Sequence, residues 1–173
     1  MKSSFVRALP ALTLTLLLSG CWRYSTSGGV VRYHGFDESN GSWDVTLTAD
    51  PSTFRTIGFH IIETKWAVDA KAAWYEGRPV HDPDSDKPAL LDGKSFKLLS
   101  GGFYAKDRQH VIFTNEVVKA NPTNFKVFDK VWGYDGNDVY YEGSATEHCT
   151  SKKLYTYTLK QACDHYLGNI PHS

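Results

Sequence analysis

The sequence predicts an all-β fold in which about three antiparallel hairpin repeats form a meander or a small twisted array. Two observations predict it. Aromatic residues make up 14% of the 173 residues, with 10 Tyr and 9 Phe against one Met, a balance that favours strands. Turn-forming and strand-forming segments also recur in the same order along the chain, which is the pattern of a repeat protein.

The first recurring element is centred on an aspartate. It reads WAVDAKAAWYEG at 66–77, YAKDRQHVIFTN at 104–115 and WGYDGNDVYYEG at 132–143. An aromatic residue opens one short strand, the aspartate forms the turn by binding backbone N–H groups, and apolar residues form the returning strand. Asp69, Asp107 and Asp135 are therefore predicted to be structural turn residues. Catalysis needs a residue once, whereas each hairpin needs its own turn, and Asp→Asn is expected to be mild.

A second element recurs before each of these hairpins. It reads DPSTF at 50–54, DGKSF at 92–96 and NPTNF at 121–125. The Asx side chain can cap backbone donors in a tight turn. The turn then delivers the phenylalanine inward, so we expect Phe54, Phe96 and Phe125 to anchor the core.

The central unit carries a family resemblance. YAKDRQHVIF at 104–113 and VVKANPTNFKVF at 117–128 resemble the DKNYY repeat family of bacterial proteins. The similarity covers about residues 50–143 and departs from the family pattern at Arg108-Gln109 and Ile112-Phe113. The resemblance implies a repeat fold in a bacterial envelope context. The family has no established reaction, so the resemblance transfers no active site.

The N-terminus indicates export. Residues 1–20 combine a short basic start with an apolar run too short to span a bilayer, as in a signal peptide. The run ends in LSGC, which resembles the lipobox of bacterial lipoproteins. The resemblance implies cleavage before Cys21 and attachment of diacylglycerol and usually a further acyl chain, such as palmitate. Trp22 is not the aspartate that retains such proteins in the inner membrane. The implied location is therefore the outer membrane, facing the periplasm.

The rest of the chain is predicted to follow this anchor as a single domain. Residues 21–29 are expected to form a lipidated tether. Residues 30–173 then form the β-repeat domain, with the repeats at about 50–143 and a C-terminal cap at 144–173. In an oxidising compartment Cys149 and Cys163 are expected to pair and to close a loop of about 15 residues, worth about 3 kcal/mol in the chain-entropy model. A Cys2His2 metal site with His148 and His165 is the alternative.

Motifs for catalysis are absent. The mature sequence contains no GxSxG, SxxK or HExxH motif, so we expect no enzyme, cofactor or metal. Asp82, Asp84 and Asp86 have a D-x-D-x-D spacing, but the glycine and glutamate of a calcium loop are missing. Their segment, residues 81–91, is expected to be a solvated surface loop.

The composition and the expected location in the cell together suggest a binding protein. Lys+Arg and Asp+Glu are both 19, a balance that argues against nucleic-acid binding. We expect a non-catalytic protein that is attached to the membrane through Cys21 and binds another protein. It could be an immunity or inhibitor protein against a secreted toxin or phage factor. The alternatives are an envelope accessory lipoprotein with a resident partner and, further off, a carbohydrate or peptidoglycan binder or an enzyme.

Overall fold

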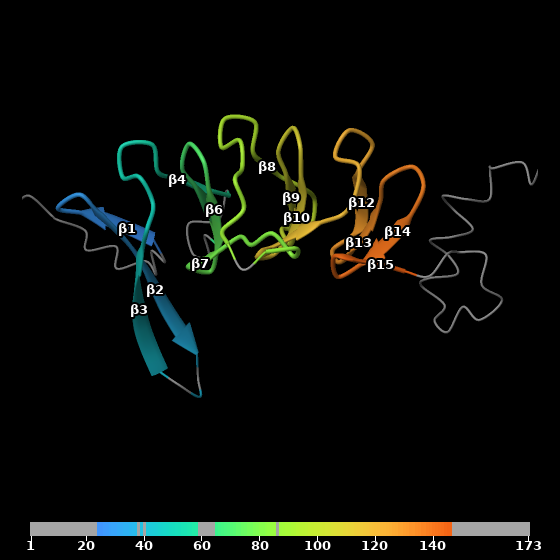
Figure 1. Ribbon diagram of the computed structural model, residues 1–173. Coiled ribbons are helices and arrows are strands. Elements are labelled where there is room, and N and C mark those ends of the chain that lie inside the picture. The colour runs from blue at the N-terminus through green and yellow to red at the C-terminus, as the bar shows by residue number, and fades with distance from the viewer. Residues whose placement is uncertain (1–23, 38, 40, 59–64, 86, 147–173) are drawn as a thin grey trace, which may run out of the picture.

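The computed structural model describes residues 24–37, 39, 41–58, 65–85 and 87–146. These residues form strands and turns and no helix, so the predicted all-β antiparallel fold is confirmed. Four small sheets lie side by side in a row (Figure 1). The strands are β1 (Tyr24–Ser27), β2 (Val30–Asp37), β3 (Gly41–Leu47), β4 (Arg55–Ile57), β5 (Trp66–Val68), β6 (Ala73–Tyr75), β7 (Arg78–Pro79), β8 (Lys97–Leu98), β9 (Tyr104–Lys106), β10 (Val111–Phe113), β11 (Glu116–Val118), β12 (Lys126–Asp129), β13 (Trp132–Tyr134), β14 (Val139–Tyr141) and β15 (Ser144–Ala145).

The predicted repeats form three four-stranded meanders. Their orders are β4-β5-β6-β7, β8-β9-β10-β11 and β12-β13-β14-β15, and every pair is antiparallel. The central hairpin has the same register in each sheet. Its opening aromatic residue pairs with the residue nine positions later: Trp66 with Tyr75, Tyr104 with Phe113, and Trp132 with Tyr141. The sequence alignment of the three units is therefore confirmed.

The N-terminal sheet repeats the same hairpin. Tyr24 pairs with Tyr33 across β1 and β2, again nine positions apart, and their ring centroids are 4.9 Å apart. The equivalent ring pairs in the three later sheets are separated by 5.0, 4.8 and 4.6 Å. The predicted boundary is thus wrong at residues 24–29, which belong to the array and not to a tether. The polar YSTS segment is compatible with a strand because only Tyr24 is buried.

Two features distinguish this N-terminal sheet. Its first turn is Gly28-Gly29, and both residues have positive φ (59° and 75°), as a two-residue hairpin of this type requires. Its second hairpin is long, because β2 continues to Asp37 and pairs with β3 along the whole of β3. The outer part of this hairpin extends away from the row of sheets (Figure 1). We call the described residues of this outer part, 34–37 and 41–44, the arm.

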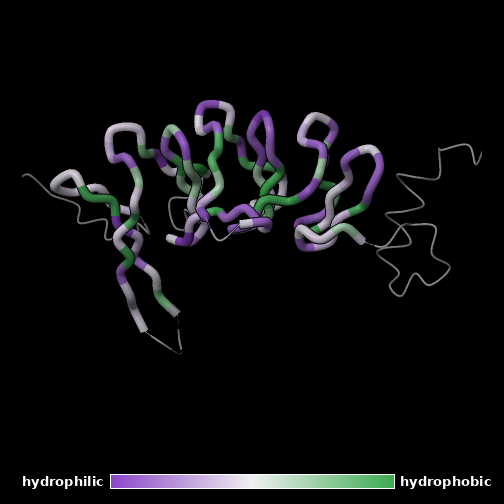
Figure 2. Tube along the Cα trace, in the orientation of Figure 1, coloured by the Kyte–Doolittle hydropathy of each residue, from purple (hydrophilic) through white to green (hydrophobic). Residues whose placement is uncertain are grey.

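The hydrophobic core lies between neighbouring sheets. Because side chains alternate along a strand, the hairpin of an inner sheet packs one face on the sheet before it and the other on the sheet after it. Ala67 and Trp74 contact the N-terminal sheet, whereas Trp66 and Tyr75 join the cluster shared with the next sheet. Hydrophobic residues accordingly gather along the strands of the row and hydrophilic residues at its loops (Figure 2).

Each predicted phenylalanine lies at one of these interfaces. Phe96 and Phe125 are buried, 5% and 3% exposed, and Phe54 is partly buried against the first cluster. Phe125 packs directly on Gly133, where a Cβ atom would lie 2.2 Å from the phenyl ring. This close contact leaves no room for a Cβ atom, which explains why this unit has Gly133 at the position that Ala67 and Ala105 occupy in the other two units.

The segment at 81–91 differs from the expected surface loop. Ala89 and Leu91 are buried in the core shared by the second and third sheets. His81 forms bridges to Pro88 and to Glu116 of β11, which attaches the segment to the next sheet. Asp82, Asp84 and Leu90 are exposed, as predicted for a surface loop. Ala89 and Leu91, near the end of the segment, instead pack in the core.

Several predictions lie outside the described residues. These are the signal peptide, the lipidation of Cys21, the pairing of Cys149 with Cys163, and the cap from 147 onward. The first two residues of the predicted cap, Ser144–Ala145, form β15 and belong to the last repeat sheet.

Candidate functional site

The three repeated aspartates lie at hairpin turns and are nearly buried. Asp69, Asp107 and Asp135 are 8%, 5% and 5% exposed. In each, Oδ1 accepts hydrogen bonds from the backbone N–H groups two and three residues later, at 2.6–3.0 Å. The backbone N–H of the aspartate also donates to the carbonyl three residues later. One oxygen of each carboxylate thus closes its own turn.

The second oxygen joins the two recurring elements of each unit. Oδ2 accepts the backbone N–H of the residue that opens the Asx turn. The donors are Asp50 for Asp69 (2.9 Å), Asp92 for Asp107 (2.8 Å) and Asn121 for Asp135 (2.9 Å). Each Asx residue in turn caps the N–H two positions later. We call this arrangement, an aspartate bound to its own turn and to the Asx turn, the aspartate clamp.

The clamps at Asp107 and Asp135 favour the ionised carboxylate. Burial, the largest single influence, raises the pKa of Asp107, but the hydrogen bonds it accepts, beginning with that from Asp92 N–H, together outweigh burial. The pKa of Asp107 therefore lies below its ordinary value of 3.8. The same balance, with Asn121 N–H as the first of the opposing bonds, lowers the pKa of Asp135.

This geometry changes one expectation. Asparagine can reproduce the Oδ1 bonds of the turn, which was the basis for expecting a mild Asp→Asn effect. Its amide NH2 would, however, face the N–H of the Asx residue where Oδ2 now accepts. The amide NH2 and the backbone N–H are both donors and cannot bond to each other. We therefore expect Asp→Asn to preserve the hairpin turn but to lose the hydrogen bond that links the hairpin to the Asx turn.

Aromatic tips connect one sheet to the next. Tyr104 Oη donates to the carbonyl of Val131 at 3.2 Å and accepts the N–H of Gly143 at 3.0 Å. Tyr24 Oη makes the equivalent bonds between the first and second sheets, two interfaces earlier, to Lys65 O and from Gly77 N–H. Burial raises the pKa of Tyr104 to about 12. The Tyr104 hydroxyl is thus a neutral cross-link and is not available as an acid or base near pH 7.

A chain of three polar side chains crosses the N-terminal sheet. Ser25 Oγ lies 2.8 Å from His34 Nε2, and His34 Nδ1 lies 2.5 Å from Asp44 Oδ1. They come from three adjacent strands, β1, β2 and β3. Sequence motifs could not reveal this group, because its members are separated by 9 and 10 residues. The nine-residue spacing of Tyr24 and Tyr33 could have revealed the pairing.

Serine, histidine and aspartate in this order are also the groups of a nucleophilic triad. Two features of the site do not fit catalysis. The side chains of His34 and Asp44 are 42% and 64% exposed, so the hydrogen bonds are open to water. Hydrogen-bonded and non-hydrogen-bonded residue pairs alternate along an antiparallel hairpin, beginning with the bonded pair Ser27 and Val30 at the two-residue turn. Ser25 N–H is therefore bonded to Arg32 and cannot stabilise an oxyanion. The hydrogen-bonded side chains of Ser25, His34 and Asp44 therefore fit a structural cross-link that fixes β1, β2 and β3 to one another.

A cavity of about 1070 Å³ lies between the second and third sheets. Its wall includes the aromatic residues Trp66, Tyr75, Phe96 and Phe103 and the cations Arg55, Lys65 and Lys97. Trp66 is only 1% exposed, so it offers no open ring face to a sugar. Arg55 donates to Gly93 O and Lys65 lies 3.0 Å from Glu76. These contacts do not support the carbohydrate-binding alternative at this position.

The acidic segment makes contacts within the protein. Asp82 Oδ1 accepts the N–H of Asp84, and Asp84 lies 2.7 Å from Lys119 Nζ. Within the described ranges, no three His, Cys, Asp or Glu side chains are grouped as metal ligands would be.

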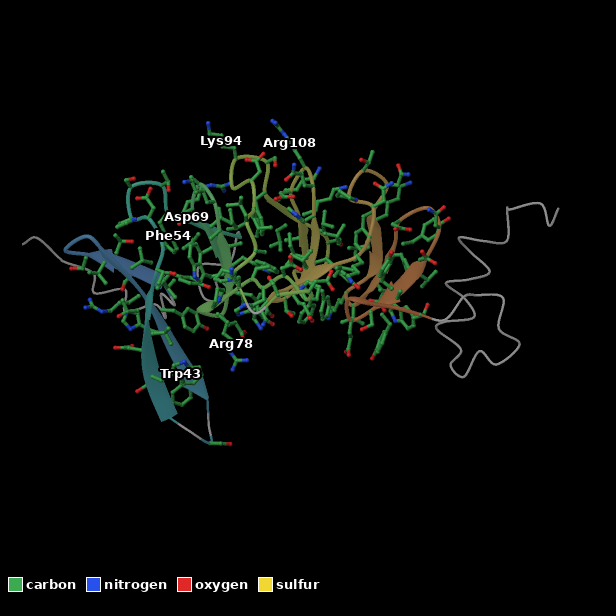
Figure 3. All side chains as sticks on the ribbon, viewed as in Figure 1. Trp43, Phe54, Asp69, Arg78, Lys94 and Arg108 are labelled. Carbon is green, nitrogen blue, oxygen red and sulfur yellow. The ribbon has the colours of Figure 1, made fainter. Side chains whose placement is uncertain are left out.

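The exposed apolar side chains gather around the arm. Of the five large hydrophobic residues exposed among the described ones, three belong to β2 and β3: Phe36 (66%), Trp43 (39%) and Val45 (36%). Figure 3 shows Trp43 on the arm and Lys94 and Arg108 at loops on the opposite side of the row. Phe36 pairs with Ser42, so its side chain lies on the opposite face of this hairpin from Trp43 and Val45. Trp43 and Val45 share one face, and exposed apolar groups that lie close together are typical of interaction surfaces.

The fold and these contacts define a β-hairpin repeat protein in which the recurring polar residues serve the scaffold. The DKNYY family matches residues 40–167, well over half of the chain, and the chain belongs to that family. The match begins at residue 40, between β2 and β3 in the sequence and before the range expected from the repeats. No curated protein and no solved structure is significantly similar. No helix in the described parts is long and apolar enough to cross a membrane.

Proposed function

We propose that this DKNYY-family chain is a lipoprotein of the outer membrane that faces the periplasm and binds another protein without catalysing a reaction. Within that class, we propose an immunity or inhibitor role against a secreted toxin or a phage factor. The anchor is the lipid on Cys21, since LSGC at 18–21 provides the only lipidation signal in the sequence.

One observation carries the binding role. The repeated acids and tyrosines are used inside the scaffold by the clamps and the tyrosine cross-links. The exposed apolar side chains, in contrast, concentrate on one projecting hairpin. A protein that uses its recurring polar groups in its own structure and exposes three of its five exposed large apolar side chains on one hairpin is suited to bind, because apolar and aromatic side chains dominate interface energies.

The immunity role is tested through the genes that flank this one. We expect a neighbouring gene to encode an exported toxin, and we expect co-expression of the lipoprotein to protect cells from that toxin. The purified mature protein should bind the purified toxin. Protection without binding, or binding without protection, would contradict the immunity role. A resident envelope protein as the sole partner would favour the accessory role instead.

The anchor is tested separately. Cys21→Ser should release the protein from the membrane fraction or leave it unprocessed, because the acyl chains supply the membrane affinity. Mass spectrometry of the N-terminal peptide should show a lipidated Cys21 in the parent. An unmodified Cys21, or full membrane retention of Cys21→Ser after a carbonate wash, would contradict the anchor.

A further inference from the structure

The longest sheet edge in the described chain is β3. It has seven residues and pairs only with β2 among the described strands. The edge strands of the other three sheets have two to four residues. Long open edges can recruit foreign strands, and proteins usually shorten or cover them. The array follows this rule everywhere except at β3.

The outward backbone groups of β3 can be assigned from the register. The two-residue turn at Gly28-Gly29 makes Ser27 and Val30 a hydrogen-bonded pair, and bonded pairs alternate from there. Tyr33 and Gly35 then bond toward β3, which uses the backbone of Val45 and Trp43. The N–H and C=O groups of Ser42, Asp44 and Thr46 therefore point away from β2, where a further strand would lie.

The side chains of β3 define what such a strand would carry. Residues 42 to 46 are exposed, and their chemistry alternates. Trp43 and Val45 form an apolar face that continues from the buried Leu47. Ser42, Asp44 and Thr46 form a polar face whose single charge is negative. A complementary strand alternates apolar and polar residues and places a cation opposite or diagonal to Asp44.

A second copy of this chain fits this edge less well. In an antiparallel pair of two β3 strands centred on Asp44, the two carboxylates face each other. Centring the pair on Trp43 or Val45 removes that repulsion but leaves about five residues paired on each strand. A contact of this size is far smaller than a stable dimer interface, which buries roughly 1,200–2,000 Å². A different protein can add contacts to Phe36 and to the first sheet.

We propose that the outer edge of β3 binds the partner by strand addition. The partner contributes an extended segment that alternates apolar and polar residues and carries a basic residue near Asp44. Main-chain hydrogen bonds to Ser42, Asp44 and Thr46 supply affinity, and the contacts to Trp43 and Val45 supply specificity. This inference rests on the proposed protein-binding function and assigns a surface to it.

The test uses the full chain in cells that co-express its flanking genes. A photoreactive benzoylphenylalanine replaces Ser42 on the arm or, as matched exposed controls, Lys94 and Arg108 on the opposite side. The Ser42 derivative is then combined with Thr46→Pro, which removes an outward N–H without touching the β2–β3 bonds, or with Thr46→Val, which keeps that N–H. Thermal melts check that each variant folds.

We expect one protein adduct from position 42 and none from positions 94 and 108. Thr46→Pro should reduce its yield at least about tenfold, since a lost backbone bond weakens strand addition, whereas Thr46→Val should retain it. Sequencing the cross-linked peptide should show an alternating segment with a basic residue. An adduct that Thr46→Pro leaves unchanged, or an adduct with a second copy of this chain, overturns the inference.

The controls separate this inference from the proposed function. A protein adduct at position 94 or 108 and none at 42 overturns strand addition at β3 and leaves protein binding in place. The absence of a protein adduct at all three positions, together with no binding to the products of the flanking genes, overturns both.

Discussion

The N-terminal sheet and the three repeat sheets start from the same hairpin and differ in what holds it. In β5-β6, β9-β10 and β13-β14 an aspartate clamp ties the hairpin to the Asx turn before it. In β1-β2 the position of the aspartate is taken by Ser27, and the turn is Gly28-Gly29. The 23 residues that precede β1 contain neither Asp nor Asn, and Ser27 has no carboxylate to form a second bond.

The comparison shows which parts of a unit serve stacking and which serve connection. The aromatic pair is present in all four sheets because each sheet must bury a face against its neighbour. The aspartate is present only in the three sheets in which it binds a preceding Asx turn. The first sheet has no such link and instead has the hydrogen-bonded side chains of Ser25, His34 and Asp44 and the arm.

The largest expected effect tests the stacking contacts. Phe125→Ala should reduce the free energy of unfolding by about 3–5 kcal/mol, because it empties a buried site between Tyr104 and Tyr140. Phe54→Ala should cost less, since Phe54 is only partly buried. Urea denaturation of both variants measures the difference, and equal losses would contradict the inferred ranking of the interfaces.

The next largest effect tests the clamp. Asp107→Val should cost more than Asp107→Asn, because valine accepts none of the bonds from Asp92, Gln109 and His110. Asp107→Asn should still cost about 1–3 kcal/mol, since Asp92 N–H loses its acceptor. Thermal or urea melts measure both. If Asp107→Asn unfolds like the parent protein, Oδ2 contributes nothing to the connection.

The pH dependence of stability tests the ionised state of the clamps. The pKa values of Asp107 and Asp135 are lowered in the folded protein, from an ordinary value of 3.8. Their contribution is therefore complete above that value and is lost as the pH falls below it through the folded pKa. Unfolding free energies measured between pH 7 and pH 2 should decrease below about pH 4. Asp107→Asn should show a shallower decrease, and an identical slope would contradict the ionised clamp.

A smaller effect compares two equivalent cross-links. Tyr104→Phe and Tyr24→Phe should each cost about 1–2 kcal/mol, because each leaves a backbone carbonyl and an N–H without the tyrosine hydroxyl. Similar losses in melts would support one stacking rule for the N-terminal sheet and the repeats. If only Tyr104→Phe lowers the free energy of unfolding, the N-terminal sheet does not stack on its neighbour in the same way as the repeat sheets.

The smallest effect concerns the serine. Ser25→Ala should remove one exposed hydrogen bond and change the unfolding free energy by less than about 1 kcal/mol. The parent protein should not react with a fluorophosphonate probe, because the N–H of Ser25 is paired with Arg32 and cannot serve an oxyanion. Labelling that disappears in both Ser25→Ala and His34→Ala would overturn the cross-link interpretation and reopen hydrolysis.

Much of the scaffold could be predicted from the sequence because it repeats. Asp69, Asp107 and Asp135 were identified by recurrence, and strand register follows from the aromatic residues around them. The Oδ2 bond could not be predicted, because it joins residues 14 to 19 positions apart through the folded turn. Of the first sheet, only β1 was missed, since its serines and the following glycines match a flexible tether in composition. The Ser25–His34–Asp44 chain depends on pairing across three strands.

The central claim is that the clamps hold the scaffold and the arm binds the partner. The most direct test measures melting temperature and partner binding for Asp107→Asn and Trp43→Ala side by side. We predict that Asp107→Asn melts at lower temperature and, while folded, binds the partner as the parent does. Trp43→Ala should remain folded and lose binding, although the Trp43 ring also packs on Gly35. Normal melting with complete loss of binding in Asp107→Asn, or undiminished binding in Trp43→Ala, would contradict the claim.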